Sequence, residues 1–461
     1  MNIQEFQALV FQAAQEQGLK DYDLYYQKTS TQEYEVYQGE IEKFSGTTVM
    51  GACFRCLLEG HMGYSSTQRF SQEDARNLVE QAVESARAVE SKDPQFLYDG
   101  SLGTAQSLKS ASGRAPAAQD MRDAALELER LALAEDSRIQ EVSGCQVAYE
   151  EWEIHMANSR GMDLSRGSQV LVAYVEDMAK VEGKPLNAYA VKVAETLDGL
   201  DLKACARLAA ENTLGFVGAK SIPSGTYPVV FSSKAMISLL DTFSGVFSAD
   251  NAQRGLSLLG DQVGKTIASD ALTLVDDPLY AGCINKVPFD AEGVPTHRKA
   301  VVEGGVLTTL LHNLKTAAKA GVPSTGNACK WGYTSPVGVA PSNFYVQPGT
   351  LSREELFQAV GEGLLITELR GLHAGANAQS GDFSLECRGY RITGGQKGAP
   401  VDQIVIASNF YELLKQVVAV GDDLEFGTPG ADSCFGSPSV WVRGAAIAGQ
   451  EDGTASQSQG K

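Results

Sequence analysis

Glycines that separate short runs of alternating apolar and polar residues place the strongest constraint on how this chain can fold. The sequence has 47 glycines among 461 residues. Near the N-terminus, the alternating runs 33–38 and 47–57 are separated and followed by Gly39, Gly46 and Gly60. Strict alternation is typical of half-buried strands, and glycine permits the tight turns between them. The sequence therefore predicts a large content of antiparallel β-structure.

Segments with helical periodicity flank these runs and predict a mixed fold. Apolar residues recur at helical spacing over 3–14, 75–86, 121–134 and 202–209. The order of helix, strands and helix thus occurs twice in the N-terminal half. We expect an α+β protein with two small helix–antiparallel-sheet units in the N-terminal half, followed by a large β-rich C-terminal domain.

Shifts in composition predict where these parts begin and end. A stretch rich in Ser, Gly, Ala and Pro reads as a linker, a Pro/Gly hinge begins at Ser221, and the last residues are polar without an apolar anchor. The expected division is a first α+β unit at 1–90, a linker at 91–116, a second α+β unit at 117–220, a β-rich domain at 221–449 and a disordered tail at 450–461.

The charge of the chain argues against several classes of partner. Lys and Arg total 38 against 57 Asp and Glu, which gives a formal net charge of −19. Nucleic-acid binding rests largely on cationic side chains that displace counterions, so we expect no direct nucleic-acid partner. No apolar stretch approaches the roughly 18 residues of a membrane span, and no signal-peptide pattern is present. With its eight scattered cysteines, the chain is expected to be cytoplasmic and free of structural disulfides.

Short motifs give little support for self-contained catalysis. The glycines of Gly260–Thr266 are one residue too close for a phosphate loop. Cys53 and Cys56 lack the second cysteine pair of a zinc site, and as strand residues three apart they should point to opposite faces and act as buried or half-exposed thiols. The five histidines form no H-E-x-x-H pattern, and no G-x-S-x-G elbow occurs. The sequence 276–278 reads as a turn, because Asp precedes Pro there.

Several phrases, taken in order, resemble the TldD/PmbA family, whose members were once described as modulators of DNA gyrase. They are FDAEGVPTHRK at 289–299, STGNA at 324–328, GLHAGAN at 371–377 with SGDFS at 380–384, VAVGDDL at 418–424 and GSPS at 436–439. The similarity runs from about residue 20 to 449. It implies a metalloprotease-related fold and a role connected with proteolysis.

The resemblance also implies which metal ligands this chain lacks. TldD-like members carry H-E-x-x-x-H on a helix, with a further cysteine ligand near the C-terminus. The equivalent helix here spans 237–246, where the two histidine places hold Asp241 and Val246 and the glutamate place holds Thr242. Cys434 follows the expected cysteine position and is interpreted as coincidental. The chain therefore resembles the PmbA, or TldE, type without the zinc motif, and no cofactor is expected in it.

The resemblance implies a partner and a function for such a member. The leading hypothesis is a non-catalytic subunit of a cytoplasmic zinc metalloprotease that cuts unfolded proteins or peptides, with zinc held by a TldD-like partner and a homodimer possible without it. Candidate peptide-binding residues are Asn327, His373, Ser380 and Asp382. Two alternatives remain: a stand-alone modulator that binds a toxin, antitoxin or gyrase-related client, and a hydrolase with the atypical ligands Asp241, His373 and Cys434.

Overall fold

The computed structural model describes residues 1–90, 93–108, 115–181 and 183–450. It confirms the α+β class and the β-rich C-terminal region. The predicted tail lies outside the described residues except for Gln450, and so do parts of the predicted linker. No helix among the described residues is both long and apolar enough to cross a membrane.

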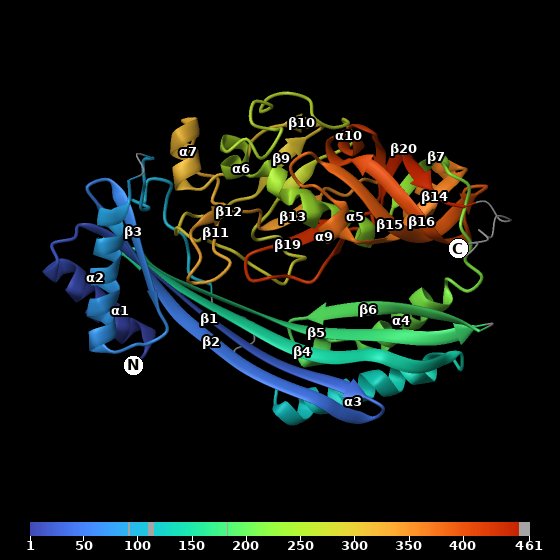
Figure 1. The fold of residues 1–461 in the computed structure, drawn as a ribbon, viewed down its shortest axis with the longest axis horizontal. Coiled ribbons are helices and arrows are strands. Elements are labelled where there is room, and N and C mark those ends of the chain that lie inside the picture. The colour runs from blue at the N-terminus through green and yellow to red at the C-terminus, as the bar shows by residue number, and fades with distance from the viewer. Residues whose placement is uncertain (91–92, 109–114, 182, 451–461) are drawn as a thin grey trace, which may run out of the picture.

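The N-terminal half is built on one curved antiparallel sheet with the strand order β3-β2-β1-β4-β5-β6 (Figure 1). Its elements are α1 (Ile3–Glu16), β1 (Asp21–Tyr37), β2 (Glu40–Leu58), β3 (His61–Thr67), α2 (Gln72–Ala88), α3 (Ala118–Glu135), β4 (Ile139–Asn158), β5 (Asp163–Val181), β6 (Lys184–Ala194), a 3₁₀ turn (Leu197–Gly199) and α4 (Leu202–Leu214).

The two predicted N-terminal units share this sheet. β1 pairs with β4 in an unbroken antiparallel register from Asp23 opposite Asn158 to Glu35 opposite Gln146. One helix pair, α1 and α2, packs on one end of the sheet, and α3 with α4 packs on the other end. The repeated helix–strand–helix order therefore describes two ends of one layer.

The C-terminal region lies over the opposite face of this sheet (Figure 1). Its elements are β7 (Gly225–Phe231), α5 (Ser233–Phe243), a 3₁₀ turn (Ser244–Phe247), α6 (Ala249–Gln253), β8 (Leu274–Asp276), β9 (Lys299–Glu303), β10 (Val306–Leu307), α7 (Leu314–Ala320), β11 (Ala328–Cys329), β12 (Gly338–Val339), β13 (Asn343–Val346), α8 (Arg353–Val360), β14 (Gly363–Arg370), α9 (Leu372–Gly375), β15 (Asp382–Thr393), β16 (Gln396–Asn409), α10 (Phe410–Lys415), β17 (Val417–Val420), β18 (Glu425–Phe426), β19 (Cys434–Ser437) and β20 (Val440–Ala448).

Two six-stranded sheets organise this region. One has the order β10-β9-β8-β13-β19-β18, and the other has the order β16-β15-β14-β7-β20-β17. An additional pairing between β16 and β20 closes the second sheet into a barrel. α5 packs between the sheets, because its residues join side chains from both in one large core.

The predicted linker is partly integrated into the fold. Leu97 and Tyr98 are buried, and the backbone of Leu108 pairs with that of Arg166 in β5. The side-chain amide of Asn158 donates a hydrogen bond of 3.0 Å to the carbonyl of Tyr98. The described part of this segment therefore packs along the β4–β5 turn rather than spanning open solvent.

Candidate functional site

The helix that the sequence matches to the family's metal-binding helix is α5, together with the 3₁₀ turn that follows it. The side chain of Ser232 caps α5 by accepting a hydrogen bond from the N–H of Ala235, and Leu239 and Leu240 fix the helix in the core. Asp241 lies on the exposed side, where nearby protein atoms still raise the pKa of its carboxyl by desolvation.

The other two motif positions face inward or bond within the helix. The hydroxyl of Thr242 donates a hydrogen bond of 2.8 Å to the carbonyl of Ser238. Val246 is 1% exposed and belongs to the large core. Zinc needs nitrogen, sulfur or oxygen ligands, and Val246 has none to offer. These positions do not fit a zinc ion.

A cysteine near the C-terminus does not complete a metal site either. Cys434 is 3% exposed, and its thiol donates to the carbonyl of Gly427 at 3.4 Å. Within the described residues, no three His, Cys, Asp or Glu side chains are grouped closely enough to hold a metal ion. The atypical ligand set Asp241, His373 and Cys434 therefore forms no such group.

Cys53 and Cys56 confirm the interpretation of buried thiols. They are 3% and 0% exposed, and they belong to different clusters on opposite faces of β2. Burial is the main reason that the pKa of both thiols is raised. The pKa of Cys56 rises to about 11.

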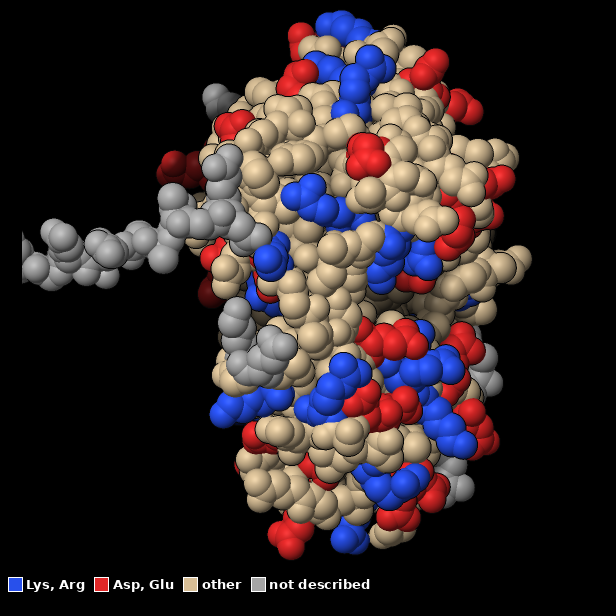
Figure 2. All heavy atoms as spheres, turned by 90° about the vertical axis from the view of Figure 1, so that its right-hand side faces the viewer, with Lys and Arg blue, Asp and Glu red and all other residues tan. Residues whose placement is uncertain are grey.

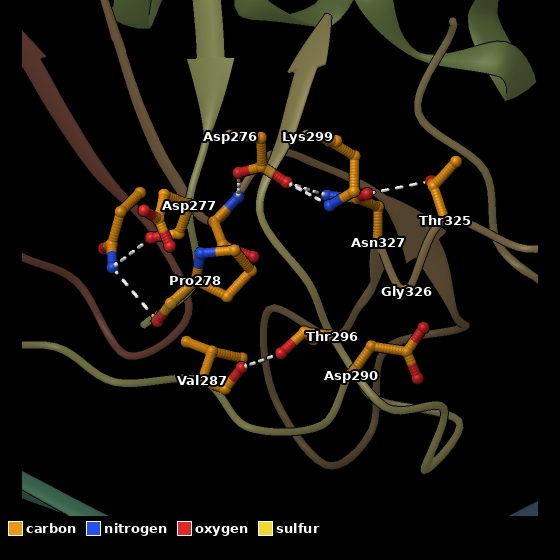
Figure 3. A network of polar contacts seen from close by, with 12 residues as sticks. Asp276, Asp277, Pro278, Val287, Asp290, Thr296, Lys299, Thr325, Gly326 and Asn327 are labelled. Atoms are coloured by element: carbon orange, nitrogen blue, oxygen red, sulfur yellow. Dashed lines mark hydrogen bonds and ion pairs between the residues drawn. The ribbon is translucent and has the colours of Figure 1, made fainter. Parts of the chain in front are cut away.

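A buried polar network lies at the end of β8 and the start of β9 (Figure 3). Asp276 is fully buried, and its carboxylate accepts from the ammonium of Lys299 at 2.9 Å, from the amide of Asn327 at 2.8 Å and from the N–H of Ser342 at 2.8 Å. The chain turns at Asp277 as the sequence predicts. Asp276 itself is a core residue that holds three segments together.

Asn327 is saturated by partners inside this network. Its amide nitrogen donates to Asp276 and, at 3.1 Å, to the carbonyl of Ala340, while its oxygen accepts from the hydroxyl of Thr325 at 2.8 Å. The side chain is 2% exposed. The peptide-binding role of Asn327 stays a prediction, and its amide would have to leave these partners to fulfil it.

The loop at 289–299 owes its shape to Asp290. The carboxylate accepts from the N–H groups of Glu292 at 2.9 Å, Val294 at 3.0 Å and Ala328 at 3.0 Å. Burial raises the pKa of Asp290 to about 6, against the lowering effect of these bonds. Gly293 at the tip has a φ of +83°, which glycine adopts without strain. The segment 289–299 therefore contains a turn that hydrogen bonds to Asp290 hold in place, and Phe289 and Ala291 pack against the N-terminal sheet.

A buried ion cluster joins this turn to the N-terminal sheet. Arg55 of β2 is paired with Asp23 of β1, with Nε and Oδ1 2.9 Å apart, and one of its terminal nitrogens lies 3.8 Å from Glu292. Glu292 also accepts from the N–H of Leu314 at 2.8 Å. Burial is the main cause that raises the pKa of Glu292. Sequence reasoning missed this cluster, because no local pattern links residues so far apart.

The remaining predicted peptide-binding residues lie in one stretch of the chain that runs from α9 to the start of β15. His373 is in α9 and exposed. The hydroxyl of Ser380 donates to Asp382 at 2.8 Å, and the amide of Asn409 donates to the same carboxylate at 2.9 Å. These two bonds, that of Asn409 first, lower the pKa of Asp382. The carboxylate is exposed and anionic.

An open pocket of about 640 Å³ lies beside this loop and is lined by residues 374–378 and 382–384. Asp382 borders it, whereas His373, Ser380 and Asn327 are not among its lining residues. A second cavity, of about 320 Å³, lies between the predicted linker, the β4–β5 turn and Gly293. The sequence did not point to the second cavity, because its walls come from three distant segments.

The face of the molecule that includes the barrel and the nearby end of the N-terminal sheet carries both signs of charge. Figure 2 shows Lys and Arg side chains interleaved with Asp and Glu on this face, most densely over its lower half. A continuous basic surface, of the kind that tracks a phosphate backbone, is not present on the face in view.

Comparisons with known proteins connect this architecture to a family. The model for domain 1 of the PmbA/TldA metallopeptidases matches residues 22–86, and the model for their C-terminal domain matches residues 224–449. The metalloprotease PmbA of Escherichia coli O157:H7 is 31% identical over 216 residues, which is 47% of this chain and 45% of that protein. A PmbA homologue of Haemophilus influenzae is 27% identical over 390 residues, which is 84% of each chain.

Solved structures agree over nearly the whole chain. A Thermotoga maritima protein described as a proposed modulator of a DNA gyrase has a TM-score of 0.87 and 29% identity, covering 97% of this chain and 100% of its own. TldE of Thermococcus kodakarensis shares the fold, with a TM-score of 0.87 and 20% identity over 96% of this chain and 99% of that one. The long sheet and the barrel-containing region are thus of the PmbA/TldA metallopeptidase type. The chain belongs to the TldD/PmbA family.

Proposed function

We propose that this chain is the TldE-like, non-catalytic subunit of a cytoplasmic zinc metalloprotease whose other subunit is TldD-like and holds the metal. The observation that carries the proposal is the state of the metal-binding helix. Val246 is buried in the core and has no ligating atom, and Thr242, whose hydroxyl bonds within α5, has no carboxylate that could act as a general base. Two of the three motif places therefore lack the groups that the zinc motif supplies.

The peptide would be held by the surface of the paired subunits rather than by a catalytic group of this chain. The loop with His373, Ser380 and Asp382 supports this proposal, since it borders an open pocket and presents an anionic carboxylate. Backbone hydrogen bonds to an extended peptide tolerate diverse side chains, which suits unfolded substrates. Asp382 would favour peptides that carry a cation near the bound segment.

The test is to purify this chain alone and together with a TldD-like subunit, and to measure zinc per chain and cleavage of an unfolded protein. We expect the chain alone to bind no stoichiometric zinc and to cleave nothing. We expect the mixture to cleave, and to lose activity when the glutamate of the partner's H-E-x-x-x-H motif becomes glutamine.

Two variants of this chain sharpen the result. Asp241→Ala should leave the zinc content and the activity of the complex unchanged, as should the matched control Asp250→Ala on the neighbouring α6. Stoichiometric zinc and cleavage by the chain alone, abolished by Asp241→Ala only, would overturn the proposal in favour of a hydrolase with atypical ligands.

A further inference from the structure

Two cysteine side chains that are far apart in the sequence meet in the C-terminal region. Cys283 lies in the segment that connects β8 to β9, and Cys434 is the first residue of β19. Their thiols form a side-chain hydrogen bond with each other, in which Cys283 donates. The thiol of Cys434 donates onward to the carbonyl of Gly427 at 3.4 Å. The two sulfur atoms are therefore neighbours in the folded chain.

Buried amide side chains hold the backbone around the two cysteines together. Asn285, two residues after the first cysteine, donates to the carbonyls of Gly430 and Ala431 at 3.1 and 3.2 Å. Asn343 lies opposite Cys434 in the parallel pairing of β13 with β19, and its amide donates to the carbonyl of Asn285 at 3.0 Å. Both asparagine side chains are fully buried. The contact between the thiols thus follows from the packing of three segments.

Both thiols are buried, but one of them lies directly beneath an exposed turn. Cys283 and Cys434 are 4% and 3% exposed, whereas Ala281 and Gly282, which come just before the first cysteine, are exposed. The ammonium of Lys286 donates to the carbonyl of Cys283 and closes this turn. A small oxidant needs only a shift of the turn to reach the sulfur atoms, whereas a bulky thiol reagent needs a larger opening.

Hydrogen bonding makes the two sulfur atoms chemically different. The hydrogen bond from Cys283 lowers the pKa of Cys434 against the raising effect of burial, and the N–H of Phe435 lowers it further. The same hydrogen bond between the thiols, followed by burial, raises the pKa of Cys283. The thiolate is the reactive form of cysteine, and a thiol beside it can resolve its first oxidation product. Cys434 is thus the sulfur atom to be oxidised first.

Another pair of buried cysteines lacks this arrangement. Cys145 and Cys205 belong to one core cluster, but their thiols donate to backbone carbonyls, those of Ala125 and Ala173, both at 3.6 Å. Burial raises the pKa of both thiols, to about 12 for Cys205. These two side chains stay protonated, and they provide an internal comparison.

We propose that Cys283 and Cys434 form an intramolecular disulfide when the folded chain meets hydrogen peroxide. The Cys434 thiolate attacks one peroxide oxygen, the O–O bond breaks, and a sulfenic acid and hydroxide form. The hydroxide takes up the proton that Cys434 released and becomes water. The Cys283 thiol then attacks the sulfenic sulfur, an S–S bond forms, and the hydroxyl group leaves with the Cys283 proton as a second water. Two thiols are oxidised and one peroxide is reduced.

The disulfide fixes a segment that touches both α5 and the N-terminal sheet. A Cβ atom on Gly427 would lie 3.4 Å from the side chain of Ile237 in α5. In the same connection between β18 and β19, Asp432 is paired with Arg166 of β5. Oxidation therefore ties the segment before β9 to a place where three parts of the molecule meet. The reaction requires neither zinc nor a TldD-like subunit, and its failure would leave the proposed function untouched.

Peptide mapping tests the disulfide directly. The folded chain is treated with hydrogen peroxide, its free thiols are alkylated in denaturant, and it is digested without reductant. We expect a cross-linked peptide that contains Cys283 and Cys434 and that dithiothreitol separates, with the other six of the eight cysteines alkylated. A sulfinic acid on Cys434 without a cross-link, or oxidation of Cys145 and Cys205 at the same rate, would overturn the proposal.

Two variants separate the attacking sulfur from the resolving one. Cys283→Ser removes the resolving thiol, so dimedone, which reacts with sulfenic acids, should label Cys434 several-fold more strongly than in the wild-type chain. Cys205→Ser is the matched control, and it should leave the cross-link intact. Circular dichroism before oxidation shows that each variant is folded. A folded Cys283→Ser chain without dimedone label on Cys434, or a cross-link that Cys205→Ser abolishes, would contradict the assignment.

Discussion

At the scale of single residues, the structure separates two kinds of buried carboxyl group. Asp276 and Asp290 accept several hydrogen bonds each, and these bonds tie segments of the C-terminal region together. Asp177 in β5 differs from them. It is fully buried, both of its carboxyl oxygens lack a hydrogen-bond partner among the described residues, and burial raises its pKa to about 7.

This raised pKa predicts a dependence of stability on pH. In the unfolded chain an aspartic acid has a pKa of about 4, so the folded state binds the proton more tightly. Protonation of Asp177 therefore stabilises the folded state relative to the unfolded state. This contribution is fully present below about pH 4 and is lost as the pH rises from about 4 to about 7. We expect Asp177→Asn to raise the melting temperature by a few degrees at pH 8 and to have little effect near pH 4.

Thermal unfolding followed by circular dichroism at both pH values measures this difference. Asp163→Asn is the control, since the side chain of Asp163 lies on the same strand and is 63% exposed. Equal shifts at pH 8 and pH 4 would contradict the assignment to the Asp177 carboxyl.

The sequence predicted which residues to examine as a candidate site, but it did not predict which other residues they contact. The structure places two of the residues matched by family resemblance, Asp241 and Thr242, on α5 and the third, Val246, on the 3₁₀ turn that follows it; their equivalence to the zinc motif stays a prediction. The sequence could not show that the amide of Asn327 is occupied by Asp276, or that Arg55 reaches Glu292. Such contacts depend on how distant segments pack, and no local pattern records that.

At the scale of elements, the sequence predicted the five long helices α1 to α5 and the presence of strands, but it missed the shorter helices α6 to α10 and broke the long strands into pieces. β1 reads as two short runs, because residues 29–33 are polar, yet it continues from Asp21 to Tyr37. Neither helix pair covers the middle of the sheet, so apolar alternation is not required there. Alternation reports burial rather than strand length, which is why the single sheet was predicted as two.

Close packing between α2 and β3 gives a prediction at this scale. Gly63 has no side chain, and a Cβ atom there would lie 1.9 Å from the carbonyl oxygen of Ala82 and 2.8 Å from the Cβ of Ala86. We expect Gly63→Ala to push α2 off the sheet and to lower the melting temperature markedly. Gly332→Ala, whose nearest neighbour would be 3.9 Å away, should leave it unchanged. A Gly63→Ala protein as stable as this control would show that α2 moves without cost.

At the scale of the whole molecule, the two halves are joined by shared cores and by buried ion pairs. Side chains of β1, β2 and β4 pack against Phe289 and Ala328 in one cluster. Arg166 of β5 is paired with Asp432 and also lies 5.7 Å from the centre of the Phe289 ring. Arg55 connects Asp23 to Glu292 across the same boundary. The halves are therefore expected to unfold together.

Arg55→Leu tests this coupling. The change leaves two buried carboxyl groups without their cation, and breaking a buried pair in this way costs about 3–5 kcal/mol. Arg160→Leu is the matched control, because Arg160 also pairs with an aspartate of β1 but lies on the surface, where a pair contributes about 1 kcal/mol or less. Denaturant titration should show a much lower midpoint for Arg55→Leu only. Equal denaturation midpoints for the two variants would show that the buried Arg55 ion pairs do not couple the two halves.

The pairing of β1 with β4 has a consequence for the synthesis of the chain. The ribosome releases β1 and β2 well before residues 146–158, which β1 needs on its other side. Until those residues emerge, the nascent hairpin exposes backbone groups on both flanks, and long-range strand pairing is slow to form. A pause in translation between residues 68 and 138 would lengthen this vulnerable interval, so chaperone capture during synthesis should concentrate on nascent chains of that length.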